Sequence, residues 1–286
     1  MTDVELVLDC RNTLGEGPMW SVAEQALYWV DIKGEQVHRF VPASGEHRQY
    51  DVGQEVGAVL LRASGDFVLA MQNGLYTWEP GSAPELIVDP EPDKPANRFN
   101  DAAVDRQGRV WAGTMADGEE PVGGLYRLDP DRSLHTIDPE VYISNGLGWS
   151  PDDRILYFCD SKIGIRVWDF DPATGDVSNE RPFAETNPAD GLPDGLTVDS
   201  EGCVWAAHWG GWKVVRYDPK GRVIDEIAVP ASCTSSVMFG GPDLEDLYIT
   251  TARTDMLKHG GQQEQAGGLY RARPGVKGLP EPAWGG

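Results

Sequence analysis

Six short segments of the sequence resemble one another, and most of them open with a polar residue that could take part in chemistry. The opening residues are Glu16, Val56, Asn100, Asn145, Asp194 and Ser235. A small residue, usually Gly, and a few apolar residues follow in most segments, and the openings are 40, 44, 45, 49 and 41 residues apart. Self-similarity at this period indicates a repeat architecture, in which equivalent residues occupy equivalent places.

Glu16, Asn145 and Asp194 have the side chains of a metal site. If the repeats surround one axis, these residues lie at one height and offer hard oxygen ligands, with no His or Cys in the same column. Two carboxylates balance a divalent charge, and oxygen ligands favour Ca²⁺, Mg²⁺ or Mn²⁺. Three protein ligands leave positions open for water or substrate. Asp and Asn before a strand are also ordinary turn residues, but a purely structural role would not require polar oxygens to recur in one column.

Short strands must position these segments. A run of β-branched and aromatic residues follows each opening segment after a turn, at 26–31, 66–71, 109–114, 155–160, 203–208 and 246–251. Such runs are typical of strands, and no segment has the sustained 3.6-residue periodicity of a substantial helix. Strands on a period of 40 to 50 residues predict an all-β fold, a six-bladed β-propeller with four-stranded antiparallel blades, in one domain over residues 1–286. Because the first strand of a blade lines the central channel, the column should converge at one mouth of it.

The N-terminal segment is expected to complete the ring. The sixth repeat supplies three clear strands, and the tail after Pro274 is rich in Gly and Pro. The segment VELVLD at 4–9 precedes the first repeat and has no partner there. We expect it to form the outer strand of the last blade, which would remove an exposed sheet edge. The alternative is a frayed terminus.

The composition excludes several classes of partner. The formal net charge is -22, which repels nucleic acid and anionic membranes. The four cysteines are far apart, which favours buried thiols over a zinc site or a disulfide framework. The N-terminus lacks a basic region followed by an apolar one, and no apolar run is long enough to span a bilayer. We therefore expect a cytoplasmic protein with no obligate protein partner.

Longer motifs resemble those of a known family. They are LGEGPMW (14–20), NRFNDAAVDRQGRVWAGTM (97–115), SNGLGWSPD (144–152), PDGLTVDSEG (193–202) and FGGPDLEDLYITTAR (239–253). In this order and spacing, the chain resembles the regucalcin/gluconolactonase-like family, also called the senescence marker protein family. The resemblance implies hydrolysis of the lactones of aldonic acids. It also implies a divalent metal ion, for which calcium, zinc, manganese and iron(II) are all associated with the family.

The resemblance also assigns roles to residues. It implies that Glu16, Asn145 and Asp194 hold the metal, the three residues that the repeat column selects. It implies that Arg98 and Asn100 contact the substrate, and that Asp194 acts as a general base as well as a ligand. Some members carry an acidic pair directly after the GTM segment, one of which contacts sugar. Here that stretch is GTMADGEEP, so the chain departs from the pattern, and Glu119 is the candidate for this contact.

Together with the metal site that the repeat column predicts, the resemblance implies a sugar lactonase in which the metal polarises the lactone carbonyl and Asp194 assists the attack of water. Its type could be that of a gluconolactonase, a xylonolactonase or an arabinonolactonase. Two alternatives use the same ligands: a calcium-binding regulatory protein, and an esterase or organophosphate hydrolase on the same propeller. His208 and Trp209, at the end of a predicted second strand, could border the substrate, although a structural role is favoured for His208.

Overall fold

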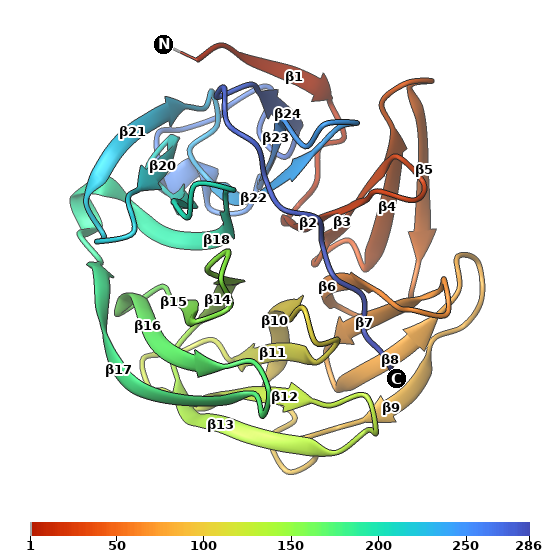
Figure 1. The fold of residues 1–286 in the computed structure, drawn as a ribbon. Coiled ribbons are helices and arrows are strands. Elements are labelled where there is room, and N and C mark those ends of the chain that lie inside the picture. The colour runs from red at the N-terminus through yellow and green to blue at the C-terminus, as the bar shows by residue number, and fades with distance from the viewer. Residues whose placement is uncertain (1) are drawn as a thin grey trace.

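The computed structural model describes residues 2–286, which form six four-stranded antiparallel sheets around a central channel (Figure 1). The innermost strands of neighbouring blades contact one another around the channel. From the channel outward, the first three blades contain β2 (Gly15–Ser21), β3 (Ala26–Asp31), β4 (Gln36–Val41) and β5 (Glu46–Asp51); β6 (Val56–Leu61), β7 (Phe67–Met71), β8 (Gly74–Trp78) and β9 (Glu85–Val88); and β10 (Arg98–Val104), β11 (Val110–Met115), β12 (Gly123–Leu128) and β13 (Leu134–Val141).

The other three blades follow the same plan. They contain β14 (Ser144–Trp149), β15 (Ile155–Asp160), β16 (Gly164–Asp171) and β17 (Asp176–Glu185); β18 (Leu192–Val198), β19 (Val204–Trp209), β20 (Lys213–Tyr217) and β21 (Val223–Ala228); and β22 (Thr234–Gly240), β23 (Asp246–Thr251), β24 (Leu269–Ala272) and β1 (Val4–Leu8). In residues 2–286 helix is limited to two single 3₁₀ turns, η1 (Pro188–Asp190) and η2 (Met256–Lys258). The predicted six-bladed β-propeller is confirmed, and so is the expectation of no substantial helix.

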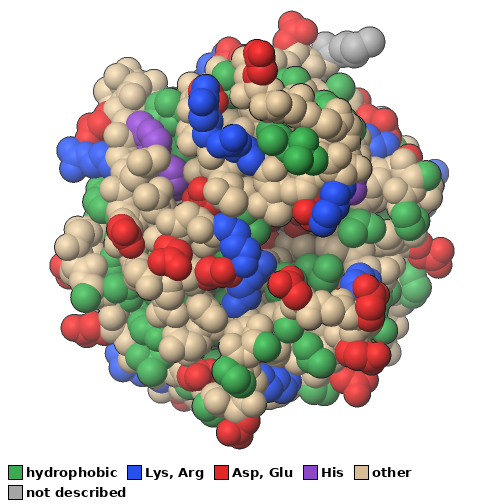
Figure 2. Space-filling view, turned by 180° about the vertical axis from the view of Figure 1, so that it is seen from behind, with side chains coloured by type: hydrophobic (Ala, Val, Ile, Leu, Met, Phe, Trp, Pro, Cys, Tyr) green, Lys and Arg blue, Asp and Glu red, His purple; other side chains and the backbone are tan. Residues whose placement is uncertain are grey.

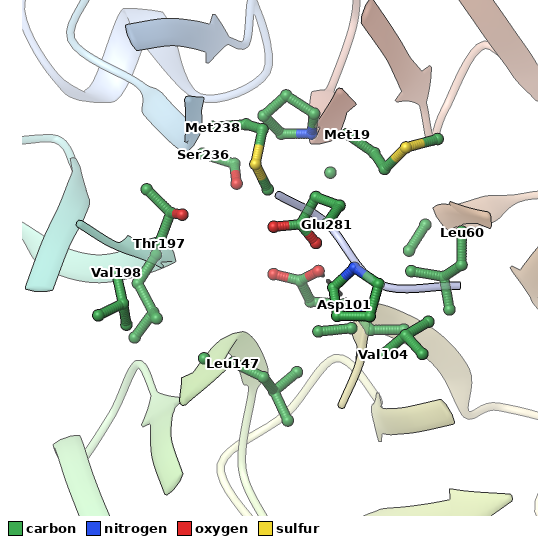
Figure 3. Close-up of a pocket in the computed structure, with 18 of the residues that line it drawn as sticks. Met19, Leu60, Asp101, Val104, Leu147, Thr197, Val198, Ser236, Met238 and Glu281 are labelled. Atoms are coloured by element: carbon green, nitrogen blue, oxygen red, sulfur yellow. Dashed lines mark hydrogen bonds between the residues drawn. The ribbon is translucent and has the colours of Figure 1, made fainter. Parts of the chain in front are cut away.

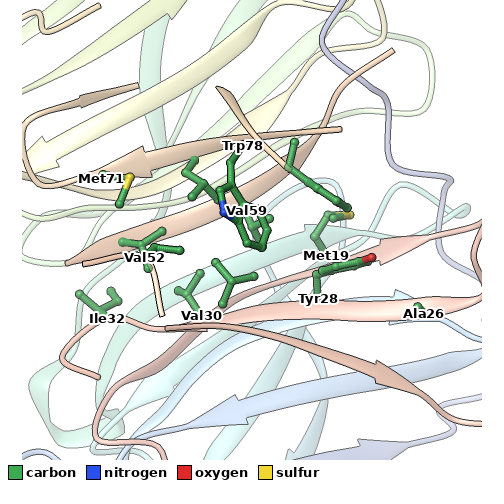
Figure 4. Close-up of a cluster of buried hydrophobic side chains, with 13 residues drawn as sticks. Met19, Ala26, Tyr28, Val30, Ile32, Val52, Val59, Met71 and Trp78 are labelled. Carbon is green, nitrogen blue, oxygen red and sulfur yellow. The ribbon is translucent and has the colours of Figure 1, made fainter. Parts of the chain in front are cut away.

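The hydrophobic core lies between blades rather than within them. Each sheet is covered on both faces by its neighbours, so the second strands are almost wholly buried, whereas outer strands such as β5 are largely exposed. The cluster between the first two blades contains Met19, Tyr28 and Val30 from one blade and Val59 and Trp78 from the next (Figure 4). Burial on both faces explains why the second strands are near-continuous apolar runs in the sequence.

The N-terminal strand closes the ring, as predicted. Strand β1 pairs antiparallel with β24, with Val4 opposite Ala272 and Leu6 opposite Tyr270. Val4 and Leu6 pack against the apolar cluster between the fifth and sixth blades. The last blade is therefore built from both ends of the chain.

The tail after β24 crosses one end of the channel, and we call residues 273–286 the C-terminal strap. It leaves the sixth blade, where the Gly278 N–H donates to the carbonyl of Leu244 at 2.8 Å. It ends between the second and third blades, where Trp284 exchanges backbone hydrogen bonds with the strand end at Leu61 and Ala63 and is fully buried. In Figure 1 the strap runs in dark blue across the front of the ring. Among residues 2–286 there is no helix with the length and apolar character to span a membrane.

Candidate metal and substrate site

The predicted ligands lie at the end of the channel opposite the C-terminal strap. Glu16 in β2, Asn145 in β14 and Asp194 in β18 stand near the start of innermost strands and are 4%, 4% and 5% exposed. The strap lines the channel together with the later residues of the same strands. Figure 2 views the molecule from behind, toward the mouth at which these strands begin, and shows a hollow near its centre with basic and acidic side chains around it.

A local irregularity turns the column toward the channel. In all six blades the pairing of the innermost strand with the second strand is interrupted at the column. In the three blades with predicted ligands, the interruptions lie between Glu16 and Met19, Ser144 and Leu147, and Pro193 and Leu196. Such bulges end regular pairing and re-aim a side chain. The repeated Gly after the column residue has a steric reason, because at Gly57 a Cβ would lie 2.6 Å from the carbonyl oxygen of Asn100.

A chain of hydrogen bonds joins four residues at the mouth. The Nη1 of Arg98 donates to Oδ1 of Asn100 at 2.5 Å, and Nδ2 of Asn100 donates to Oδ1 of Asn145 at 2.9 Å. The Nδ2 of Asn145 in turn donates to Oγ of Ser161 at 2.7 Å. Asn100 also donates to the carbonyl of Ser144 at 2.7 Å, so both of its amide hydrogens are engaged. The structure therefore brings together one predicted ligand, Asn145, and two of the three predicted substrate contacts, Arg98 and Asn100.

The two carboxylates at the mouth share one electrostatic environment. Burial is the main cause that raises the pKa of Glu16 and of Asp194, and the charges of neighbouring carboxylates raise both further. The charge of Asp101 acts on both groups, and the charge of Glu16 also acts on Asp194. The guanidinium of Arg98 acts in the opposite direction on both groups. An arrangement of buried like charges calls for a compensating cation.

The donor set fits a divalent metal ion. Within residues 2–286, Oδ1 of Asp194 is buried and has no hydrogen-bond partner. Leaving a buried acceptor unpaired costs about 1–3 kcal/mol, so an orphan oxygen beside a second carboxylate points to a ligand that completes the site. Two carboxylates and the amide oxygen of Asn145 are hard donors that suit such an ion. Ser235, in the same column, is already engaged: its hydroxyl donates to the carbonyl of Gly15 at 2.5 Å and lies 3.0 Å from Oγ1 of Thr250.

Arg98 is held by Glu55, a residue outside the repeat column. Its Nε lies 3.3 Å from Oε2 of Glu55, and Oε1 of Glu55 lies 2.6 Å from Nζ of Lys33. Burial lowers the pKa of Arg98, and the carboxylate of Glu55 is the first of the charges that oppose this shift. Glu55 stands directly before Val56, the apolar member of the column. Its position next to a column residue could have marked Glu55 as a residue of the channel mouth. Its pairing with Arg98 could not be predicted in this way, because Arg98 lies in another blade.

Glu119 lies apart from this cluster. Its side chain is 93% exposed, and its carboxylate pairs with Nζ of Lys162 at 2.9 Å. The neighbouring Asp117 is among the charges that act on Arg98, whereas Glu119 is not. Of the acidic residues in this loop, Asp117 is therefore the one that the fold brings toward the predicted substrate contacts.

A second group of potential ligands has a structural explanation. Asp199, Glu201 and Cys203 lie close enough together to hold an ion. However, Oδ2 of Asp199 already accepts from Nε1 of Trp205 at 2.9 Å and from Nη2 of Arg216 at 2.6 Å. Its Oδ1 accepts from the backbone N–H of Glu201 and of Cys203, both at 2.9 Å. The carboxylate is saturated and its charge is balanced, so this trio is a turn stabilised by hydrogen bonds.

His208 is also occupied. Its Nε2 lies 3.0 Å from the hydroxyl of Tyr217, and its Nδ1 lies 3.0 Å from the carbonyl of Asp190. Burial lowers the pKa of His208, which leaves the neutral ring in place. These contacts agree with the structural role that the sequence favoured.

Comparison with known proteins identifies the family. The family model described as the SMP-30/gluconolactonase/LRE-like region matches residues 14–253. The chain belongs to this family. A protein of Bacillus subtilis (strain 168) named sugar lactone lactonase YvrE is 39% identical over 276 residues, covering 95% of this chain and 94% of its own. Pentonolactonase XacC of Haloferax volcanii is 35% identical over 288 residues, covering 97% of each chain.

A solved structure gives the same result. A calcium-binding protein named regucalcin from Agrobacterium tumefaciens str. C58 superposes with a TM-score of 0.92 at 27% identity, covering 99% of this chain and 97% of that one. The resemblance inferred from the motifs is therefore confirmed. The region that matches the SMP-30/gluconolactonase/LRE-like family contains the whole channel column, and it ends before the C-terminal strap begins.

Proposed function

We propose that the chain hydrolyses a sugar lactone to the corresponding aldonic acid at the mouth of the channel, with a divalent metal ion held by Glu16, Asn145 and Asp194. The observation that carries this proposal is the orphan Oδ1 of Asp194, buried beside a second carboxylate whose pKa is raised in the same way. Membership of a family whose relatives include a sugar lactone lactonase and a pentonolactonase supports the choice of substrate class.

The carboxylate of Asp194 has two tasks in this proposal. A divalent ion, when bound, supplies Lewis-acid polarisation of the lactone carbonyl. Asp194 offers one oxygen as a ligand, and its other oxygen accepts a proton from the water that attacks the carbonyl carbon. The oxygen of that water becomes part of the new carboxyl group. The bond between the carbonyl carbon and the ring oxygen breaks, and the ring oxygen takes up a proton to become a hydroxyl.

Arg98 and Asn100 orient the sugar. Within residues 2–286, the Nη2 of Arg98 makes no hydrogen bond or ion pair, so it can donate to a hydroxyl or to the developing oxyanion. Asn100 already donates both amide hydrogens, so it can only accept from a sugar hydroxyl. A lactone is an activated ester, and a positioned water with these groups requires no covalent intermediate.

A panel of pentonolactones and hexonolactones tests the proposal. The protein is first stripped of metal by exhaustive chelation, and turnover is then measured after addition of Ca²⁺, Mn²⁺, Zn²⁺ or Fe²⁺, with spontaneous ring opening subtracted. We expect turnover of at least one lactone that depends on added metal. Full activity in the chelated protein would overturn the metal site.

A pair of matched variants distinguishes a local effect from a change in overall charge. Glu16→Gln and Glu201→Gln each remove one negative charge, but only Glu16 lies at the mouth of the channel. We expect Glu16→Gln to lower both metal affinity and turnover and Glu201→Gln to change neither. Tight metal binding without turnover of any lactone would instead favour a calcium-binding regulatory protein, and turnover of aryl esters alone would favour the esterase.

A further inference from the structure

A cavity in the channel lies between the column at the mouth and the C-terminal strap. Its volume is about 70 Å³, and its walls are mostly apolar, with Met19, Leu60 and Met238 among the lining residues (Figure 3). The strap supplies Leu279, Pro280, Glu281 and Pro282 as its floor. A water molecule needs roughly 10–15 Å³ by this measure, so the cavity has room for several.

Two carboxyl groups enter this apolar cavity from different parts of the chain. Asp101 comes from β10 and is 7% exposed, and Glu281 comes from the strap. Figure 3 shows both carboxylates pointing into the middle of the cavity. Oδ1 of Asp101 accepts from the adjacent backbone N–H of Ala102 at 2.7 Å. In the part of the chain that the structure describes, no hydrogen bond reaches its Oδ2 or the carboxylate of Glu281.

The protein offers little compensation for these charges. The pKa of Asp101 and that of Glu281 are both raised to about 7, mainly by burial, and the charge of Asp101 contributes to the shift at Glu281. Arg106 also lines the cavity and acts on Glu281 in the opposite direction. Its Nη1, however, already donates to the carbonyl of Ser150 at 3.0 Å and to the carboxylate of Asp153.

Further oxygen donors lie around the same space. The hydroxyl-bearing residues Thr197 in β18 and Ser236 in β22 line the cavity and are 7% and 4% exposed. In Figure 3 both hydroxyl groups are drawn on the side facing the two carboxylates. Two carboxylates, two hydroxyls and several waters are the hard oxygen ligands that Ca²⁺ takes in irregular geometry.

We propose that this cavity binds a second divalent cation, a partly hydrated Ca²⁺, between Asp101 of the ring and Glu281 of the C-terminal strap. The ion would fasten the strap to the third blade and close the channel beneath the catalytic site. The proposal does not rest on the reaction at the mouth, because its four side chains are none of those proposed to hold the first ion or the substrate; only the charge of Asp101 also acts on Glu16 and Asp194.

The number of tightly bound Ca²⁺ ions per chain tests this assignment. Full-length protein is stripped of metal and titrated calorimetrically with Ca²⁺ at pH 8, where both carboxyls can ionise, in about 0.15 M salt to screen weak surface binding. We expect two tight sites in the wild type and one in Glu281→Gln. Glu16→Gln should also retain one, and the Glu16→Gln, Glu281→Gln double variant should retain none.

The variants also separate this site from the catalytic one. Glu281→Gln keeps the size of the side chain and is expected to leave lactone turnover unchanged, while the added stability that Ca²⁺ gives the wild type at pH 8 is reduced. Asp101→Asn provides a second variant that should also lose one ion. A wild type with a single tight site that Glu16→Gln abolishes, or a Glu281→Gln protein that still binds two ions, would overturn the proposal, whatever the result of the lactone assays.

Discussion

The two ends of the central channel are built by different means. At the mouth, Glu16, Asn145 and Asp194 come from three innermost strands that repeat one sequence pattern, and each is turned inward by the same interruption of pairing. The floor is closed by the C-terminal strap, which has no counterpart elsewhere in residues 2–286 and is held by Trp284 between the second and third blades.

The difference separates chemistry from stability. Groups at the mouth are polar, buried and incompletely paired, an arrangement that costs stability and suits a ligand. Apart from Glu281, the groups that anchor the floor are apolar or hydrogen-bonded, so they stabilise the ring without offering anything to a substrate. Substitutions at the floor should therefore unfold the protein before they impair turnover, and substitutions at the mouth should do the reverse.

The largest expected effect is on stability, from Trp284→Ala. Trp284 is fully buried in the cluster between the second and third blades, and the guanidinium of Arg62 lies 5.3 Å from its ring centre. Truncation of a buried Trp costs about 3–5 kcal/mol. We expect a loss of this size in the free energy of unfolding measured with urea, and normal turnover in the fraction that remains folded.

A matched substitution controls for the loss of a large aromatic residue. Trp212 lies in a connecting loop and is 38% exposed. We expect Trp212→Ala to cost less than about 1 kcal/mol, because partly exposed positions contribute little. Equal destabilisation by the two variants would argue against the strap as the main anchor of the floor.

At the mouth, Asp194→Asn should affect turnover rather than stability. The substitution removes one ligand charge and the proposed proton acceptor, so we expect kcat to fall about 100- to 1000-fold. The melting temperature of the metal-free protein should stay the same or rise, because a buried charge is removed. Asp190→Asn is the control, since Asp190 precedes the same strand with a side chain that is 53% exposed, and it should keep wild-type kcat.

Closure of the ring by β1, like the strap at the floor, should contribute to stability and not to turnover. Removing residues 2–9 deletes β1, leaves the edge of β24 unpaired and uncovers the half-buried Val4 and Leu6. The lost burial is worth about 2 kcal/mol. We expect a lower melting temperature and unchanged turnover at or below about 20 °C, where the truncated protein should still be folded. A truncated protein that melts like the wild type would mean that β1 contributes no stability.

Asn100 and Arg98 are hydrogen-bonded to each other, but their substitution by Ala should have different effects. Asn100 donates to Oδ1 of the proposed ligand Asn145, and loss of such a supporting hydrogen bond weakens metal affinity about 10- to 100-fold. Arg98 touches none of the three ligands, so Arg98→Ala should leave metal affinity intact and lower kcat/KM by about threefold to tenfold. Calorimetric metal titration alongside lactone kinetics distinguishes the two variants. Equal metal affinity in Asn100→Ala and Arg98→Ala would show that Asn100 does not support the metal site.

Much of the mouth could be predicted from the sequence because repetition gives the relative positions of distant residues. Once six segments are aligned, Glu16 and Asp194 become neighbours across the axis although 178 residues separate them in the chain. The closing strand was predictable for a related reason, since the last blade lacked one strand and the residues at 4–9 had the pattern of one.

The remaining features depend on contacts that no repeat encodes. The strap has few regular hydrogen bonds and a composition rich in Pro and Gly, so nothing in its sequence indicates that Glu281 enters the channel. In the loop after β11, a difference of two positions separates Asp117, which acts on Arg98, from the exposed Glu119. Loop conformation decides that difference, and one sequence does not determine it.

The smallest expected effect tests whether the mouth depends on a residue outside the repeat column. Once a divalent ion neutralises Glu16 and Asp194, Glu55 remains as the close carboxylate partner of the buried guanidinium of Arg98, at 3.3 Å from Nε. Glu55→Gln should therefore let Arg98 leave its position and lower kcat/KM. The decrease should be at most the loss expected for Arg98→Ala, which is about threefold to tenfold. In the Arg98→Ala background the same substitution should have no further effect, a non-additivity that a double-mutant cycle measures. Lys33 also pairs with Glu55, but its side chain is 41% exposed, and Lys33→Met should leave kcat/KM unchanged. Additive losses from Glu55→Gln and Arg98→Ala would show that Glu55 acts independently of the arginine.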